Sequence, residues 1–265
     1  MDYILRGRAV NAKPPARGKY AEAISLFKRA LALDPQSIEA QSFLAITLTG
    51  RVVDNMTDSV AADIERAKGL SEQALAASPR SGLAHFAKAQ VLRAQNRFEE
   101  AIPEYEMALP GNRNWVNAIA ALGQCKFFTG SIEEVIPLEE QAIRLSPRDP
   151  QLGVWYHRIG SVHLLQSRTD EAILWFEQAR SANPELPHIR SHLASAYALR
   201  GETERAAAEL AQARRLVGDD RFSSIARLTA VGYFGVSAYW GVPKVRALFE
   251  ATYFAGLRKA GMPEE

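Results

Sequence analysis

Apolar and small residues recur at helical spacing in the stretch GSVHLLQSRTDEAILWFEQARSANP, which runs from Gly160 to Pro184. Ala172, Phe176 and Ala179 are four and three residues apart, so they share one face of a helix. Pro184 ends that helix, because proline lacks an N–H and disfavours helix in the residue before it. Gly160 lies on the preceding helix, where the absence of a side chain allows a second helix to approach closely. The stretch therefore predicts one helical hairpin.

The small–aromatic–small pattern of this second helix recurs along the chain. The corresponding triplets are Ala23, Phe27 and Ala30; Ala67, Ser71 and Ala74; Ala101, Tyr105 and Ala108; Val135, Glu139 and Ala142; and Ala206, Leu210 and Ala213. Small residues of the first helices lie twelve positions upstream, at Ala89, Gly123, Gly160 and Ala194. The triplet with Val135 and Glu139 departs furthest from the pattern, so we expect the least regular packing there.

This pattern resembles the tetratricopeptide repeat (TPR), whose period is 34 residues. The resemblance covers residues 2–217 and implies an all-α fold, a right-handed superhelix (α-solenoid) of about six helical hairpins. Residues 51–60 exceed the family spacing and predict either a lengthened helix or a protruding loop. Pro103 and Pro137 fall inside second helices and are expected to kink them or to delay their start.

Residues 218–265 break the repeat pattern and predict a C-terminal cap on a TPR array of residues 1–217. The final helix carries an apolar stripe and a stop signal, with Val245, Leu248, Phe249, Tyr253 and Leu257 followed by Gly261 and Pro263. A repeat array needs such an element to shield its last apolar face. Between array and helix stand Tyr233, Phe234, Tyr239 and Trp240. These aromatics predict either an interface, such as that of a homodimer, or a fold-back onto the last repeat.

Composition narrows the classes of function. The net charge is +2, from 32 basic and 30 acidic residues, and this balance argues against a nucleic-acid surface. The only cysteine, Cys125, is predicted to be a small buried side chain, and it permits no internal disulfide. No signal peptide is recognisable, so we expect a cytoplasmic protein, and the abrupt start on a helix suggests part of a longer one. The longest uncharged run, residues 228–242, is too short to span a bilayer.

The sequence lacks motifs for catalysis or cofactor binding. Neither a phosphate-binding glycine-rich loop nor a zinc-protease HExxH motif is present, and no nucleophile elbow is complete. His188 and His192 have the four-residue spacing of a zinc site, but no acidic residue or cysteine nearby in the sequence completes a ligand set. We therefore predict a chain without enzymatic activity, cofactor or metal.

Polar residues on the inner faces of first helices are the candidates for partner binding. In TPR proteins these faces line a concave groove that holds peptides, although a polar face can also be merely solvated. His163 is predicted to pack in the core instead. The candidate groove residues are Asn117, Gln124, His157, Arg158, Ser161, His188, His192 and Ser195. The family's carboxylate clamp needs lysine, asparagine and arginine, and the corresponding positions hold residues such as Glu39, Phe43 and Phe86, so binding of chaperone tails is not expected.

A second resemblance concerns the sequences DYILRGRA, EAISLFKRALALDPQSIEAQSFLA and FAGLRKAGMPEE. They are similar to the C-terminal TPR halves of bacterial class III adenylate or guanylate cyclases, in which a catalytic domain precedes the repeats. The resemblance implies a regulatory half without the catalytic sheet. We therefore expect a non-catalytic protein-interaction scaffold of a signalling protein, with a protein or peptide partner. The alternative is a small-ligand sensor that uses the groove or the aromatic C-terminal region.

Overall fold

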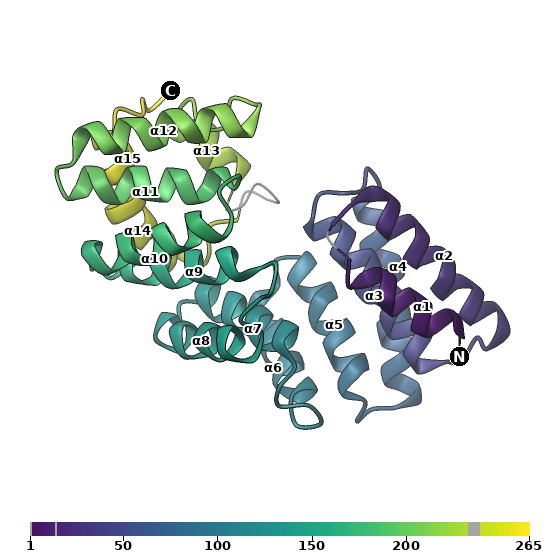
Figure 1. Cartoon of the computed structure of the whole chain (residues 1–265). Coiled ribbons are helices and arrows are strands. Elements are labelled where there is room, and N and C mark those ends of the chain that lie inside the picture. Colours follow the sequence, from purple (N-terminus) through teal and green to yellow (C-terminus); the bar gives the residue numbers. More distant parts are fainter. Residues whose placement is uncertain (1, 14, 233–238) are drawn as a thin grey trace. The chain divides into compact units, whose positions relative to one another are not determined.

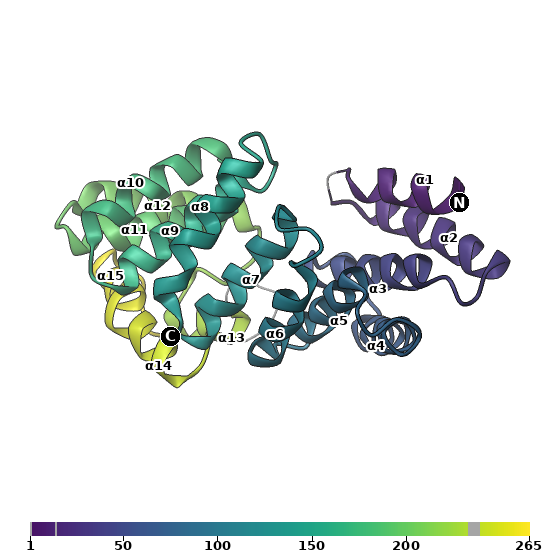
Figure 2. The ribbon, with the colours of Figure 1, turned by 90° about the horizontal axis from the view of Figure 1, so that it is seen from below.

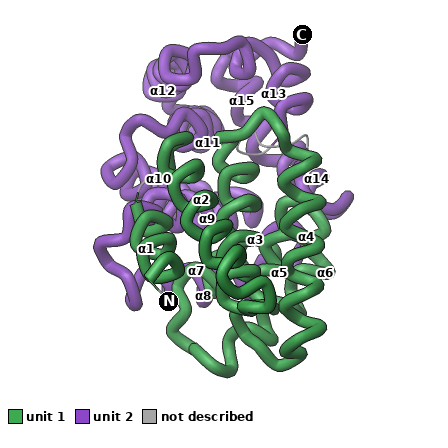
Figure 3. Tube along the Cα trace, turned by 90° about the vertical axis from the view of Figure 1, so that its right-hand side faces the viewer, with its two compact units in different colours: residues 1–125 green, residues 126–265 purple. Residues whose placement is uncertain are grey.

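The computed structural model describes residues 2–13, 15–232 and 239–265, and this part of the chain is helical, without strands (Figure 1). It forms two compact units, residues 1–125 (unit 1) and residues 126–265 (unit 2), coloured separately in Figure 3. The helix α7 (Val116–Thr129) contains the boundary. Tyr233 and Phe234, two of the predicted interface aromatics, lie outside the described residues.

Unit 1 consists of helical hairpins. Its helices are α1 (Asp2–Asn11), α2 (Arg17–Leu33), α3 (Ile38–Val53), α4 (Val60–Ala77), α5 (Gly82–Ala94) and α6 (Phe98–Ala108), followed by most of α7. Successive helices pair as α1 with α2, α3 with α4 and α5 with α6. The long spacing at residues 51–60 is resolved as a lengthened α3 and a short connection before α4, so no long loop protrudes.

Unit 2 continues the hairpins and ends in a further group of helices. Its repeat helices are α8 (Val135–Leu145), preceded by the 3-10 turn η1 (Ile132–Glu134), α9 (Leu152–Leu165), α10 (Thr169–Ala182), α11 (Pro187–Leu199) and α12 (Thr203–Val217). After them come α13 (Ile225–Val231), α14 (Pro243–Phe249), the π-helical turn η3 (Glu250–Phe254) and α15 (Ala255–Lys259). Pro137 lies two residues after the start of α8, so its helix begins late as predicted, whereas Pro103 is accommodated inside α6.

The repeat register predicted from the sequence is confirmed. Every residue of the small–aromatic–small triplets is buried, and Phe27, Tyr105 and Phe176 are fully buried. A Cβ atom on Gly160 would lie 2.6 Å from the ring of Phe176, and one on Gly7 would lie 2.6 Å from the ring of Phe27. Glycine is therefore required where the second-helix aromatic packs against the first helix.

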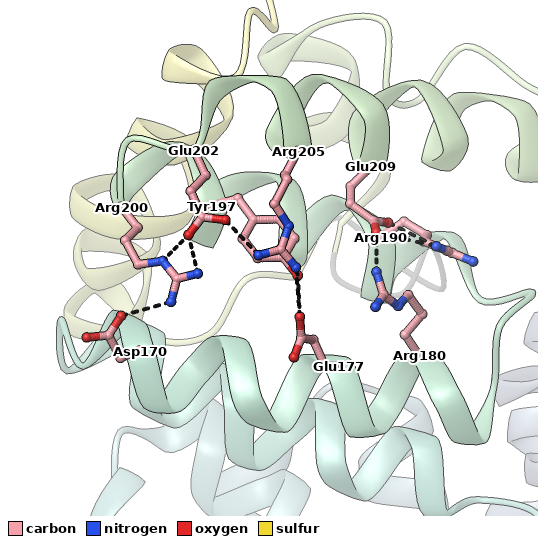
Figure 4. Close-up of polar contacts among 9 residues, drawn as sticks. All are labelled: Asp170, Glu177, Arg180, Arg190, Tyr197, Arg200, Glu202, Arg205 and Glu209. Atoms are coloured by element: carbon pink, nitrogen blue, oxygen red, sulfur yellow. Dashed lines mark hydrogen bonds and ion pairs between the residues drawn. The ribbon is translucent and has the colours of Figure 1, made fainter.

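Ion pairs join the last three repeat helices of unit 2 (Figure 4). Arg205 on α12 lies 3.9 Å from the ring centre of Tyr197 on α11, and it also donates to Glu177 on α10 at 2.9 Å. Glu209 on α12 accepts from Arg190 on α11 at 3.1 Å and from Arg180 on α10. Such partly exposed pairs contribute little to stability individually. The two pairs that reach α10, Arg205–Glu177 and Arg180–Glu209, connect neighbouring hairpins, so they orient one repeat on the next.

Candidate functional site

The inner faces of the first helices of unit 1 line an open groove of about 680 Å³, here called the unit 1 groove. Residues of α1, α3 and α5, the start of α2 and the segment before α7 contribute to it. Its lining includes Arg8, Asn11, Lys19, Tyr20, Glu39, Phe43, Ile46, Leu83, Phe86, Trp115 and Asn117. The groove is thus a surface to which several repeats contribute side chains. Figure 2 shows α3 and α5, two of the contributing helices, as neighbours.

The floor of the unit 1 groove is aromatic. Phe43 on α3 stacks on the buried Phe27, with ring centres 5.7 Å apart. Phe86 on α5 is buried beneath Trp115, and their ring centres are 4.3 Å apart. Phe43 and Trp115 stay half exposed, so they offer apolar surface to a ligand. Their inner rings hold them in place, and little side-chain entropy is lost on binding.

Cationic side chains border the aromatic floor. The guanidinium carbon of Arg8 lies 5.2 Å from the ring centre of Phe43, and Arg8 also pairs with Glu39 at 3.5 Å. The ammonium group of Lys19 lies 4.7 Å from the ring centre of Tyr20. Burial lowers the pKa of Lys19, and the carboxylate of Asp54, to which Tyr20 donates a hydrogen bond, opposes that shift. Among the residues that line the groove, Arg8 and Lys19 are cations and Glu39 is an acid, while Asp54 lies near Lys19 outside the lining. The lining itself therefore carries one more positive than negative charge.

Asn11 supplies a hydrogen-bond acceptor in the unit 1 groove. Its Nδ2 donates to Thr47 Oγ1 at 2.8 Å, and Thr47 in turn donates to the backbone oxygen of Phe43 at 2.6 Å. These bonds fix the orientation of the amide. Its Oδ1 is buried, and no donor among the described residues reaches it. An unsatisfied buried acceptor is unfavourable, but this oxygen is shielded from solvent, so a peptide N–H reaches it only if the surrounding side chains move apart.

Three of the residues predicted for the groove retain access to solvent. Asn117 is exposed and lines the unit 1 groove. Gln124 is half buried and accepts a hydrogen bond from Arg93 at 2.7 Å. His188 is half buried in unit 2, with its ring centre 6.0 Å from that of Phe222. The structure thus brings only Asn117 to the unit 1 groove.

The other predicted groove residues are buried in unit 2, which corrects their interpretation as open groove positions. His157, Arg158, Ser161, His192 and Ser195 are each 5% exposed or less. They lie on the first helices α9 and α11, as predicted, but η3 and α15 pack against these helices. The chain's own C-terminal residues therefore cover the part of this face that holds His192 and Ser195, whereas Arg158 is buried against Glu139 on α8.

The predicted interface aromatics that the structure describes pack within unit 2. Trp240 is only 4% exposed, and its Nε1 donates to the backbone oxygen of Thr229 at 3.1 Å. Its ring centre lies 5.1 Å from that of Phe249. Tyr239 is half buried, with its ring centre 5.5 Å from that of Phe128. Trp240 is therefore internal, as the fold-back alternative expected, but its contacts are with the helices that follow the last repeat rather than with the repeat itself.

The buried His192 makes the stability of unit 2 depend on pH. Burial lowers the pKa of His192 to about 3, so acidification protonates the unfolded chain first, from about pH 6.5 downward. The stability that the neutral imidazole contributes is complete above that pH and is lost as the pH falls. We expect His192→Phe to gain about 2 kcal/mol relative to the parent between pH 7.5 and pH 5. Urea unfolding at both pH values measures this change, and a pH-independent difference between the two proteins would contradict it.

The described part of the chain was also compared with the requirements of a metal site and of a membrane-spanning helix, and it meets neither. No group of three His, Cys, Asp or Glu side chains there is placed to share a metal ion. None of the described helices combines the length and apolar character needed to cross a bilayer. Cys125 is buried, as predicted.

Sequence reasoning missed most of the unit 1 groove. Arg8, Asn11, Lys19 and Trp115 were not recognised, and Phe43 was noted only as a departure from the carboxylate clamp. The available signal was the position of Phe43 and Phe86 on inner faces of first helices, where a half-exposed aromatic offers contact area to a partner.

The sequence of this chain is similar to that of a known family of repeat proteins. The sequence matches the tetratricopeptide repeat at residues 60–115 and, through a second description of this repeat, at residues 16–50 and 163–230, which together exceed half of the chain. No curated protein matches the sequence. None of these comparisons links the chain to cyclases.

Several solved structures share the fold. PilF of Pseudomonas aeruginosa has a TM-score of 0.59 at 18% identity, over 84% of this chain and 89% of PilF. YrrB, described as a TPR protein with an unusual peptide-binding site, has a TM-score of 0.54 at 18% identity, over 74% of this chain and 94% of YrrB. Yeast Tom70 has a TM-score of 0.54 at 17% identity, over 94% of this chain and 52% of Tom70. At these identities the likeness concerns the fold.

Proposed function

We propose, from the premise that this chain belongs to the tetratricopeptide-repeat family, that it is a non-catalytic scaffold whose unit 1 groove holds a segment of a partner protein. TPR proteins mediate protein–protein interaction, and the single observation that carries the proposal is the groove itself. It combines half-exposed aromatic surface, two cationic side chains and an unsatisfied buried acceptor. The peptide-binding site described for YrrB supports the same use of the fold.

The dimensions of the unit 1 groove favour an extended peptide. The lining runs from α1 across α3 and α5 to the start of α7, and neighbouring helices pack about 8–10 Å apart. An extended chain advances about 3.3 Å per residue, so about eight residues would span the groove. Apolar side chains would contact Phe43 and Trp115, and acidic groups would meet Arg8 and Lys19.

Selection of peptides from a randomised library on the full-length chain tests the proposal. We expect the selected peptides to combine large apolar residues with Asp or Glu. Arg8→Glu should weaken their binding about tenfold or more, since a charge-assisted hydrogen bond contributes about 1.5–3 kcal/mol. Arg6→Glu is the matched control, because Arg6 lies on the same helix, is similarly exposed and does not line the groove. Calorimetric titration measures the affinities.

Two outcomes would contradict this proposal. One is a library without binders, and the other is a set of peptides that bind Arg8→Glu and Trp115→Ala as tightly as the parent. Trp115→Ala removes half-exposed ring surface, so it tests the apolar part of recognition separately from the charge. A melting curve of each variant verifies that unit 1 stays folded.

The wider setting follows from the sequence and is part of the same proposal. The resemblance to cyclase C-terminal halves supports a regulatory role in a signalling protein, and the full gene would reveal a catalytic domain if one precedes these residues. A cytoplasmic location, a homodimer and the division into an array of residues 1–217 and a cap of residues 218–265 remain predictions.

The alternative of a small-ligand sensor is favoured by a groove volume within the range of about 300–1,000 Å³ typical of ligand pockets. A thermal-shift screen of metabolites distinguishes it from peptide binding.

A further inference from the structure

In unit 2 a helix of the chain itself occupies the face that corresponds to a binding groove. This segment, here called the C-terminal helix, comprises α14, η3 and α15, residues 243–259. It packs against the first helices α9 and α11 (Figure 1). Val245, Phe249, Tyr253 and Leu257 form its buried stripe, and none is more than 1% exposed. It therefore lies where a helical partner of a TPR groove would lie.

The geometry of the C-terminal helix is adapted to this face. Its buried residues are spaced by four, and in a regular α-helix each such step drifts by about 40° around the axis. The π-helical turn η3 lies in the middle of the stripe and takes up part of that drift, because its turns contain more residues. Such turns occur frequently at functional sites.

The contact between the C-terminal helix and the face is polar at its centre. The hydroxyl groups of Tyr253 and Ser191 lie 2.8 Å apart, and Ser195 Oγ donates to the backbone oxygen of Tyr253 at 2.8 Å. The ring of Tyr253 stacks on His192, with centres 4.0 Å apart and planes inclined by 16°. Beneath it the face also buries His157 and Ser161. A permanent core position favours apolar residues, whereas a face that is exposed for part of the time tolerates imidazoles and hydroxyls.

We infer that the inner face of α9 and α11 is a second protein-binding surface, which the C-terminal helix occupies until a partner helix replaces it. The chemistry of the occupant defines that partner. It is a helix with a tyrosine whose hydroxyl reaches Ser191, flanked at four-residue spacing by large apolar side chains. Burial lowers the pKa values of His157 and His192, so both imidazoles are held neutral while the face is covered.

The close approach at Gly256 offers a way to displace the C-terminal helix. A Cβ atom there would lie 2.1 Å from Ser195 Oγ and 2.5 Å from the backbone oxygen of Ser195. Because the backbone oxygen cannot rotate away, Gly256→Ala must push the helix off the face. Gly69→Ala is the matched control, since Gly69 lies in a helix and a Cβ atom there meets no atom within 4 Å. Both changes raise helix propensity equally.

Hydrogen exchange of the unmodified full-length chain is the first test. If the C-terminal helix is an exchangeable occupant, it opens without unfolding the repeats, so its amides exchange at least about tenfold faster than those of α9 and α10. Equal protection of the three segments would show that the helix belongs to the permanent core and would overturn the inference. This test needs no variant and remains decisive if Gly256→Ala fails to fold.

Binding of the segment in trans is the second test. The probe is a fluorescein-labelled peptide of residues 243–262 with the natural glycine at position 256. We expect it to bind the Gly256→Ala chain at least about tenfold more tightly than the parent and the Gly69→Ala control, in which the face is occupied. A well-folded Gly256→Ala chain that does not bind the peptide would overturn the inference. Because the inner face of α9 and α11 and the C-terminal helix both lie in unit 2, neither result affects the proposal for the unit 1 groove.

Discussion

Replacing Phe176 by alanine is expected to destabilise unit 2 by about 3–5 kcal/mol, the usual range for removing a fully buried aromatic side chain. The Phe176 ring fills the space above Gly160, which has no side chain, and it contacts His157 and His192, each with a ring-centre distance of 5.4 Å. Both hairpins that meet at this ring lose contacts. Urea unfolding followed by tryptophan fluorescence measures the loss, because three of the four tryptophans lie in unit 2.

Leu174→Ala is the control for Phe176→Ala. Leu174 lies on the same helix but is 60% exposed, so its truncation should change the free energy of unfolding by less than about 0.5 kcal/mol. Since contacts in a repeat protein join neighbours, unit 2 should melt before unit 1 in the Phe176 variant. A Phe176→Ala chain that unfolds at the same urea concentration as the parent would contradict the repeat register.

Replacing Arg158 by methionine is expected to destabilise unit 2 by about 3–5 kcal/mol at pH 8, because Glu139 would be left as an unpaired buried charge. Arg158 on α9 donates to Glu139 on α8, and both side chains are nearly inaccessible to solvent. Burial raises the pKa of Glu139 to about 7, against the opposing effect of Arg158. The folded chain therefore binds this proton more tightly than the unfolded chain. Removing Arg158 raises the pKa of Glu139 further, so in the variant Glu139 takes up its proton at a higher pH than in the parent. The effect of Arg158→Met should therefore shrink as the pH falls from 8 to about 7, where Glu139 of the parent also becomes neutral, and level off below it.

A compensating substitution separates the lost pair from a general packing defect. Glu139 holds the repeat position that Phe27, Tyr105 and Phe176 fill with aromatic rings. The double variant Glu139→Phe, Arg158→Met therefore replaces the buried ion pair with apolar side chains. We expect it to recover most of the stability, because apolar residues often replace buried ion pairs without loss. Arg144→Met is the control, since Arg144 on α8 is exposed. A double variant less stable than Arg158→Met would contradict this account.

The two units use the same repeat face in different ways. In unit 1 the face leaves an open groove lined by Phe43 and Trp115, whereas in unit 2 it is covered by the helix that carries Tyr253. Both uses are expected of one scaffold, because the inner helices present variable side chains on an invariant backbone.

The sequence by itself determined the helices and their register. The four-and-three spacing of Ala172, Phe176 and Ala179 fixes one face of a helix, and proline and glycine fix its ends. Those are local properties of the sequence, so the burial of Phe27, Tyr105 and Phe176 could be predicted without knowing which distant residues pack against them.

Only the tertiary structure decided which inner faces are open. Periodicity shows that His192 and Ser195 share an inner face, but not that a segment about sixty residues further along the chain covers them. The same limit hid the pairing of Glu139 with Arg158 and the burial of Trp240 beside Phe249. Exposure of a helix face depends on contacts between residues distant in sequence, and local spacing carries no information about such contacts.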